Sequence, residues 1–231
     1  MRDKAHDLWV WVAFDPATKL LLALQLGPRT QDVAYALLHA LSQVLAPGCL
    51  PVFTSDGLNL YFYAITAHFG QWVTDPATGK ARWQVACDLL YGQVKKTYRR
   101  RQLYRVERLM RLGELVQLTQ RLKMLGLSGT LNTAFVERLN LTLRHALAAL
   151  SRRSWATAQL TGELYAHLEC WRAYYHFCRP HSSLRLTLEV PQLRRGKQTP
   201  RRYAPRTPAM AAGLTDHIWS VEELLAFPVG Q

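Results

Sequence analysis

Apolar residues are nearly continuous in the first two segments of the chain and become periodic after them, and this change outlines the expected elements. Residues 8–14 and 19–26 are nearly continuous in apolar and aromatic side chains, with a turn beginning at Asp15 between them. This pattern predicts a β-hairpin that is covered on both faces. Residues 30–45 then carry apolar side chains three and four positions apart, which predicts an amphipathic helix.

A short strand and a second helix are expected next. Residues 51–54 are typical of a strand and residues 58–69 of a helix, and Asp56 lies in the short segment that joins them. Open α/β sheets place their reacting groups at the carboxyl ends of strands, which makes Asp56 a candidate catalytic residue. Asp is also a favoured N-cap, so a purely structural role at the start of the helix is the alternative.

The middle of the chain combines polar turns with basic and aromatic residues. Residues 71–80 are expected to form a polar loop, and residues 89–98 and 102–112 to form two strands. The turn between these strands is predicted to be basic, with Lys95, Lys96, Arg99, Arg100 and Arg101. Basic residues among aromatic ones are typical of a DNA-contacting surface, and a merely solvated basic turn is the alternative.

A helix is predicted over residues 113–125, and a more informative one starts after Asn132. Thr133 is a plausible N-cap of this second helix, because its hydroxyl can accept a hydrogen bond from a first-turn amide. One stripe of the helix is apolar and comprises Val136, Leu139, Leu143, Leu147 and Leu150. Glu137, Asn140 and Arg144 form a second stripe, which could bind a metal ion and a phosphate or could be an ordinary solvated face.

The last third of the chain is expected to be helical at first and extended afterwards. Residues 157–177 predict a long helix whose inner face includes the aromatic residues Trp171, Tyr174 and Tyr175. Residues 194–206 are rich in Arg, Lys and Pro, so we expect an extended arm that follows phosphates. Pro208 and Ser220 are expected at the starts of two further helices.

Composition favours an anionic partner. The chain has 231 residues with 29 Lys and Arg against 16 Asp and Glu, which gives a net charge of +13 and favours nucleic acid. A basic ribosomal or membrane-surface protein would have the same charge balance. The sequence contains no apolar run long enough to span a bilayer, so we expect no membrane association.

The cysteines indicate a reducing compartment. They are far apart, form no Cys-x-x-Cys pair, and follow no signal peptide, so we expect reduced thiols in a cytoplasmic protein. Cys170 and Cys178 are interspersed with three histidines, which raises the alternative of a zinc site. Their spacing matches no standard ligand pattern, so core or surface roles are favoured.

Residues 132–140, read as Asn-Thr-Ala-Phe-Val-Glu-Arg-Leu-Asn and followed by Arg144, resemble the glutamate helix of DDE-type insertion-sequence transposases. The resemblance implies that Glu137 is a metal-binding carboxylate and that Arg144 contacts DNA near the reacting phosphate. Thr-Ser-Asp-Gly at residues 54–57 is similar to the segment that carries the second catalytic aspartate of this family, which implies that role for Asp56.

Two later segments extend the resemblance over most of the chain. Residues 175–185 are similar to a signature that follows the catalytic core of transposases and integrases. Residues 207–214 resemble the Thr-Pro-Ala-x-Ala-x-Gly-Leu closing segment of transposases related to insertion sequence one.

The resemblance implies an α/β, ribonuclease-H-like fold with a mixed sheet flanked by helices, entered after its first strand. Residues 1–185 would form the catalytic core, and residues 186–231 a basic extended arm with a short helix. Mg²⁺ or Mn²⁺ ions held by three carboxylates would cleave and join DNA at transposon ends and target. A homo-oligomer or an upstream-encoded transposase half is the expected protein partner.

The first catalytic aspartate of the family has no clear counterpart. It lies upstream of the hairpin in the family, and Asp7 and Asp15 align better with non-catalytic acids, although either could substitute. The chain is therefore expected to be a transposase polypeptide without its first strand, either a split-frame product or a decayed copy. The alternatives are a non-enzymatic basic nucleic-acid binder and a host ribonuclease-H-like nuclease.

Overall fold

The computed structural model describes residues 8–151, 161–194 and 197–228. The chain divides into two compact units, which are described separately. The first comprises Met1–Ala13 and Leu22–Asn140, and the second comprises Phe14–Leu21 and Leu141–Gln231.

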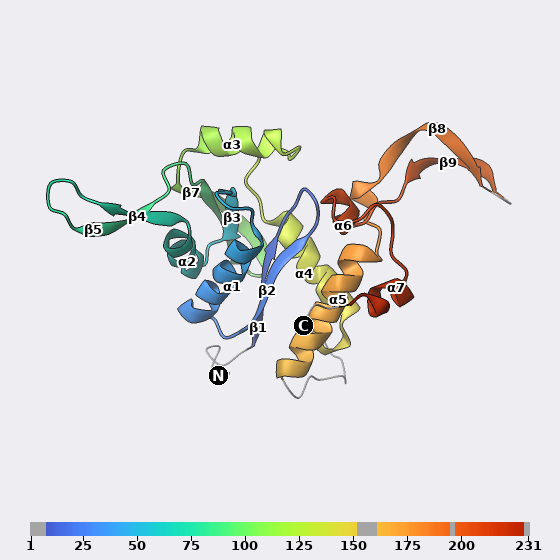
Figure 1. The fold of residues 1–231 in the computed structure, drawn as a ribbon, viewed down its shortest axis with the longest axis horizontal. Coiled ribbons are helices and arrows are strands. Elements are labelled where there is room, and N and C mark those ends of the chain that lie inside the picture. Colours follow the sequence, from blue (N-terminus) through green and yellow to red (C-terminus); the bar gives the residue numbers. More distant parts are fainter. Residues whose placement is uncertain (1–7, 152–160, 195–196, 229–231) are drawn as a thin grey trace. The chain divides into compact units, whose positions relative to one another are not determined.

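The main core of the first unit is formed by the N-terminal hairpin and two helices that lie beside it (Figure 1). Strands β1 (Trp9–Phe14) and β2 (Leu21–Gly27) form a two-stranded sheet, and helices α1 (Gln31–Val44) and α2 (Leu60–His68) pack with it. The hairpin and both helices are present as predicted, with α2 beginning at Leu60 rather than at residue 58. Their buried side chains form one cluster, whose central members are Trp11, Ala23, Ala34, Leu37, Leu38, Leu41, Ala64 and Ile65.

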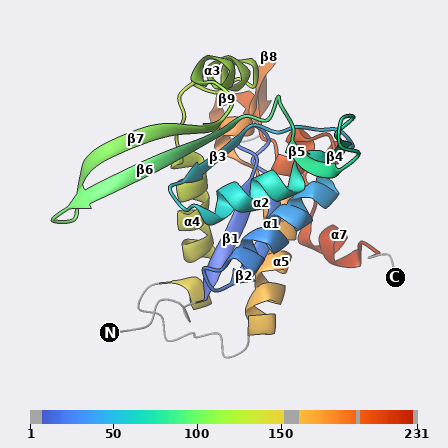
Figure 2. The same cartoon turned by 90° about the vertical axis from the view of Figure 1, so that its left-hand side faces the viewer.

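A second sheet in the same unit has mixed strand directions. Its order is β3 (Phe53–Asp56), β6 (Tyr91–Arg99) and β7 (Gln102–Leu112). Strand β3 pairs with β6 in parallel, and β6 pairs with β7 antiparallel. The protein is therefore α/β with a mixed sheet and flanking helices. Figure 2 shows β6 and β7 continuing together as a long hairpin, which we call the β6–β7 arm.

The segment expected as a polar loop over residues 71–80 is instead part of a hairpin. Strands β4 (Gly70–Thr74) and β5 (Ala81–Val85) pair antiparallel, and only the turn between them lacks strand structure. Trp72 and Trp83 lie opposite each other with their ring centroids 5.7 Å apart, and such cross-strand aromatic pairs stabilise hairpins. Most residues of this hairpin are exposed, so its strands carry no alternating apolar pattern from which the sequence could predict them.

Two helices follow the arm. Helix α3 (Leu115–Met124) begins with a capping box of Glu114 and Gln117, and its Leu118 and Leu122 pack on the sheet. Helix α4 (Ala134–Ala146) runs across the boundary of the two units. Leu139 and Leu143 on its predicted apolar stripe are buried.

The second unit is built on helix α5 (Thr161–Phe177), whose buried face is Leu164, Leu168, Trp171 and Tyr175. The first residues of the predicted helix, 157–160, lie outside the described part of the chain. Tyr174 was expected to face inward, but it is 40% exposed. The remaining elements are the short 3₁₀ helices η2 (Ala148–Leu150) and η3 (Ser182–Leu184), strands β8 (Leu186–Arg194) and β9 (Lys197–Ala204), and helices α6 (Pro208–Ala211) and α7 (Val221–Ala226).

The segment over residues 194–206 is not an isolated extended arm. It pairs with the preceding residues as the antiparallel hairpin β8–β9, because backbone hydrogen bonding between strands needs no apolar side chains. The caps at the two C-terminal helices are as predicted. Thr207 and Ser220 each accept a hydrogen bond from a first-turn amide, and Pro208 opens α6.

Among the described residues, none of the helices has the length and apolarity that crossing a bilayer requires. All four cysteines are free thiols, as expected.

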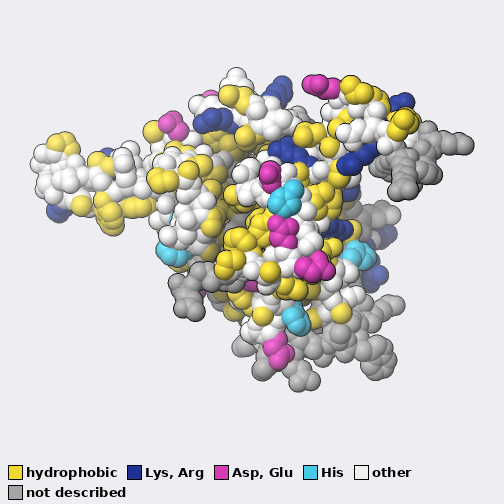
Figure 3. All heavy atoms as spheres, turned by 45° about the vertical axis from the view of Figure 1, so that its right-hand side comes forward, with side chains coloured by type: hydrophobic (Ala, Val, Ile, Leu, Met, Phe, Trp, Pro, Cys, Tyr) yellow, Lys and Arg dark blue, Asp and Glu magenta, His cyan; other side chains and the backbone are white. Residues whose placement is uncertain are grey.

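Figure 3 shows a face on which acidic side chains and histidines are scattered among hydrophobic ones.

Candidate functional site

Glu137 lies in the first turn of α4, where the side chains of Asn132 and Thr133 form hydrogen bonds with the start of the helix. The Asn132 side chain accepts a hydrogen bond from the amide of Ala134 at 3.1 Å. The Thr133 hydroxyl donates to Glu137 Oε1 at 2.6 Å. Thr133 had been expected to accept from a backbone amide, but its hydroxyl orients the carboxylate instead.

The second partner of Glu137 is Lys96 on strand β6. The Lys96 ammonium donates to Oε1 of Glu137 and forms an ion pair with it. Partial burial raises the pKa of Glu137, but the hydrogen bonds from Lys96 and Thr133 and the Lys96 charge outweigh burial, so the pKa lies below its ordinary value. Glu137 is therefore an ionised carboxylate at neutral pH.

The other members of the polar stripe on α4 are accessible. Arg144 is exposed, and Asn140 is half-buried. Their positions on one helix, three and four residues apart, keep them on the same side as Glu137. Leu147 and Leu150, which were expected to extend the apolar stripe, lie beyond the end of α4 and are half-buried.

Asp56 is the last residue of β3, whereas the sequence predicted a strand over residues 51–54 with Asp56 in the segment after it. Its side chain accepts a hydrogen bond from the amide of Leu58 at 3.1 Å and so shapes the turn into α2. It is not the N-cap of that helix, because α2 begins at Leu60 with Asn59 as its cap. Burial, and after it the negative charge of Asp56, raises the pKa of the nearby Tyr61.

Strand β6 connects the two acidic residues. Asp56 lies opposite Val94 in the parallel register, and Lys96 is two positions further along the same strand. Strand dimensions give about 8 Å between the Cα atoms of Asp56 and Lys96. Lys96 therefore bonds to Glu137 from a position close to the end of the strand that carries Asp56.

A metal ion is implied by the transposase resemblance, and the arrangement of side chains can be tested against it. Among the residues with described positions, no three His, Cys, Asp or Glu side chains are grouped closely enough to hold a metal ion. The Lys96 ammonium also occupies the place beside Glu137 that a cation would take. These residues do not form a two-metal site as they stand, and no cleavage step follows from their geometry.

Asp7 and Asp15 are the two candidates for a further metal-binding carboxylate. Asp7 lies outside the described residues. Asp15 organises the β1–β2 turn, because its carboxylate accepts hydrogen bonds from the amides of Ala17 and Thr18, each at 3.0 Å. This is the usual role of an aspartate at the start of a turn.

The predicted basic residues do not all lie in the turn between β6 and β7. Lys95 and Arg99 lie within β6 and are exposed, and only Arg100 and Arg101 form the turn. The basic turn is therefore shorter than the predicted run, whose other members belong to the strand. Lys96 was predicted to bind DNA, but its ammonium is bonded to Glu137.

Sequence reasoning missed Arg111 on β7. Its guanidinium donates to the side chains of Gln93 at 3.2 Å and Asn59 at 3.1 Å, and it lies over the ring of Phe62. Arg111 thereby ties the sheet to the start of α2, beside Asp56. Its partners are 18 to 52 residues away in the chain, and no local pattern identifies such contacts.

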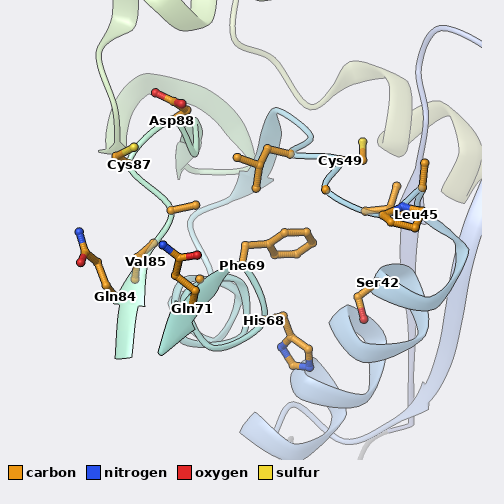
Figure 4. A pocket seen from close by; sticks show the side chains of 16 residues that line it. Ser42, Leu45, Cys49, His68, Phe69, Gln71, Gln84, Val85, Cys87 and Asp88 are labelled. Carbon is orange, nitrogen blue, oxygen red and sulfur yellow. The ribbon is translucent and has the colours of Figure 1, made fainter. Parts of the chain in front are cut away.

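A hollow of about 500 Å³ lies elsewhere in the first unit (Figure 4). Its lining includes Cys49, His68, Cys87 and Asp88, together with Phe69. Neither Asp56 nor Glu137 lines it. The hollow is therefore separate from the predicted site.

No family model, curated protein or solved structure matches this chain.

Proposed function

We propose that this chain is a DNA-processing polypeptide of the DDE transposase type. The observation that carries the proposal is the contact between Lys96 and Glu137, which connects the glutamate helix to the strand beside Asp56. The transposase resemblance assigns catalytic roles to the same two acidic residues. Its ligand would be the DNA of transposon ends and target.

We further propose that this α/β fold is ribonuclease-H-like. The order hairpin, α1, β3, α2 and then a strand parallel to β3 supports it. Helix α4 with Glu137 follows this order, as the resemblance requires. The third carboxylate of the proposed metal site would come from residues outside the described set or from a partner polypeptide, and Mg²⁺ or Mn²⁺ would bind only with Lys96 displaced.

The test is strand cleavage by the full chain with Mg²⁺ or Mn²⁺ and transposon-end DNA. We expect cleavage that Asp56→Ala and Glu137→Ala each abolish, because two-metal chemistry needs both carboxylates. Asp88→Asn and Glu163→Gln remove exposed carboxylates elsewhere and should leave cleavage unchanged. Cleavage that survives both alanine substitutions would refute the assignment of Asp56 and Glu137.

A second candidate function is DNA binding without catalysis. Among the described residues, no third His, Cys, Asp or Glu joins Asp56 and Glu137 in a group that could hold a metal ion, and this favours binding without catalysis. This function predicts that binding weakens steeply with salt, by a log–log slope of about −0.9 per duplex phosphate contacted, and that it needs no divalent cation. Binding of this kind with no cleavage under any metal condition would favour it over the transposase.

A further inference from the structure

The tip of the β6–β7 arm has an unfavourable backbone. Arg99 pairs with Gln102, so Arg100 and Arg101 alone make the turn, and their φ values are 50° and 68°. Two consecutive residues with positive φ form the turn for which Asn-Gly is the preferred sequence. Arginine lacks the freedom of glycine there, so this turn is not the one that stability alone would select.

Large apolar side chains surround these arginines without being buried. Tyr98 is 61% exposed, Leu103 is 53% exposed and Tyr104 is 66% exposed. An irregularity in the register leaves Tyr104 without a partner on β6, and the Arg99 guanidinium lies 5.8 Å from the centre of its ring. The tip thus presents two aromatic faces and three arginines to solvent.

This combination distinguishes between two kinds of nucleic acid. Contacts to a duplex backbone need positive charge only, since its bases are stacked on one another. Unpaired bases expose their faces and stack on aromatic side chains, while the neighbouring phosphates bind to basic groups. Exposed tyrosines beside the arginines therefore favour unpaired nucleotides.

We propose that the tip of the β6–β7 arm binds unpaired nucleotides, with Tyr98 and Tyr104 stacking on bases and Arg100 and Arg101 contacting phosphates. The inference rests on the proposed function for its ligand, DNA, and adds which form of DNA the arm contacts. Strained arginines at the turn keep two charges at the point that reaches furthest along the hairpin. The site would engage DNA ends that are frayed or already opened.

The first test compares the affinities of the full chain for oligothymidine of about 12 nucleotides and for a duplex of equal length. Tyr98→Ala and Tyr104→Ala should each weaken binding to the single strand by roughly 5- to 100-fold, and binding to the duplex by less than about 2-fold. Tyr98→Phe and Tyr104→Phe keep the ring and should bind like the original chain. Tyr63→Ala removes an exposed tyrosine on α2 and is the matched control.

The second test is the double substitution Arg100→Asn with Arg101→Gly. It supplies the preferred turn sequence and should raise the melting temperature by about 2–8 °C. It should also weaken single-strand binding and reduce the magnitude of the log–log salt slope by about 1.4, because two phosphate contacts are lost. Lys80→Gln with Arg82→Gln removes equal charge from the β4–β5 hairpin and should change neither property.

The outcomes separate this inference from the proposed function. Equal losses on both DNAs, no loss with either alanine variant, or a lowered melting temperature in the turn variant would overturn the inference. Binding to the duplex but not to oligothymidine would overturn it and leave the proposed function intact. Failure to bind either DNA at low salt would refute both.

Discussion

His176 in the second unit couples stability to pH. Its Nε2 atom accepts a hydrogen bond from the amide of Leu21 at 2.9 Å, which requires that nitrogen to be unprotonated. Burial first, and then the charge of Arg172, lowers the pKa of His176 to about 4. The neutral imidazole is therefore the form that the folded chain needs.

Acidification should therefore lower the stability of the folded chain. Between about pH 6.5 and pH 4 the unfolded chain binds a proton at this histidine and the folded chain does not, so stability decreases as pH falls through this range. The loss reaches about 3 kcal/mol at most, and the contribution is complete above pH 6.5. Urea unfolding across this range should show the loss, and His176→Gln should abolish this part of it, whereas His145→Gln, at an exposed position, should not.

Lys96 provides a second prediction for a single residue. Lys96→Met removes the main hydrogen bond and the positive charge that hold the pKa of Glu137 down, so the pKa should rise. The free energy of unfolding should change by less than about 1 kcal/mol, because half of the Glu137 side chain is exposed. Carboxyl titration followed by nuclear magnetic resonance measures the pKa, with Lys95→Met as the matched variant.

The same variant tests the metal hypothesis. If Glu137 is a metal ligand, Lys96→Met should strengthen Mn²⁺ binding, since the competing ammonium is gone, and Glu137→Gln in the same background should reverse the gain. Unchanged Mn²⁺ affinity in Lys96→Met would count against a metal at Glu137.

At the scale of elements, strand β6 supports the segment that leads into the glutamate helix. Gly92 is buried, and a Cβ atom at this position would lie 2.7 Å from Cδ2 of Leu131. The carbonyl of Leu131 also accepts a hydrogen bond from Arg108 at 2.9 Å. The close approach of Leu131 to β6 fixes the chain shortly before α4 begins.

Gly92→Ala should therefore destabilise the protein by about 1–3 kcal/mol, because the added methyl group displaces Leu131 in a packed core. Urea unfolding measures this change. Gly162→Ala is the control, since it lies in α5 with open space around its Cα and should be neutral or slightly stabilising. A loss of equal size in both variants would show that Leu131 is not the cause.

The elements differ in how far the sequence alone specifies them. Helix α1 was predictable because its buried residues follow the helical period, and the hairpin β1–β2 was predictable because two nearly continuous apolar runs flank a turn. The β4–β5 and β8–β9 hairpins were not, because both are largely exposed and depend on strand pairing. The sequence placed Asp56 near the carboxyl end of a short strand, to within two residues, but it could not assign Lys96 to Glu137, which is 41 residues away.

At the scale of the whole molecule, charge and fold contribute different information. The net charge of +13 favours an anionic partner, but charge alone does not select a function. Asp56, Glu137 and the β6–β7 arm belong to the first unit, whereas Arg144 belongs to the second. Helix α4 carries Arg144 onward into the second unit, so one continuous helix bears both the proposed metal ligand and its proposed DNA contact.

Lys96 has one more consequence for how this protein meets its surroundings. An ammonium group attached to the neighbouring strand is a counterion whose local concentration the buffer cannot dilute. The carboxylate of Glu137 therefore has a positively charged partner that belongs to the chain itself. A cation from solution would have to displace the Lys96 ammonium, which is covalently part of the same chain.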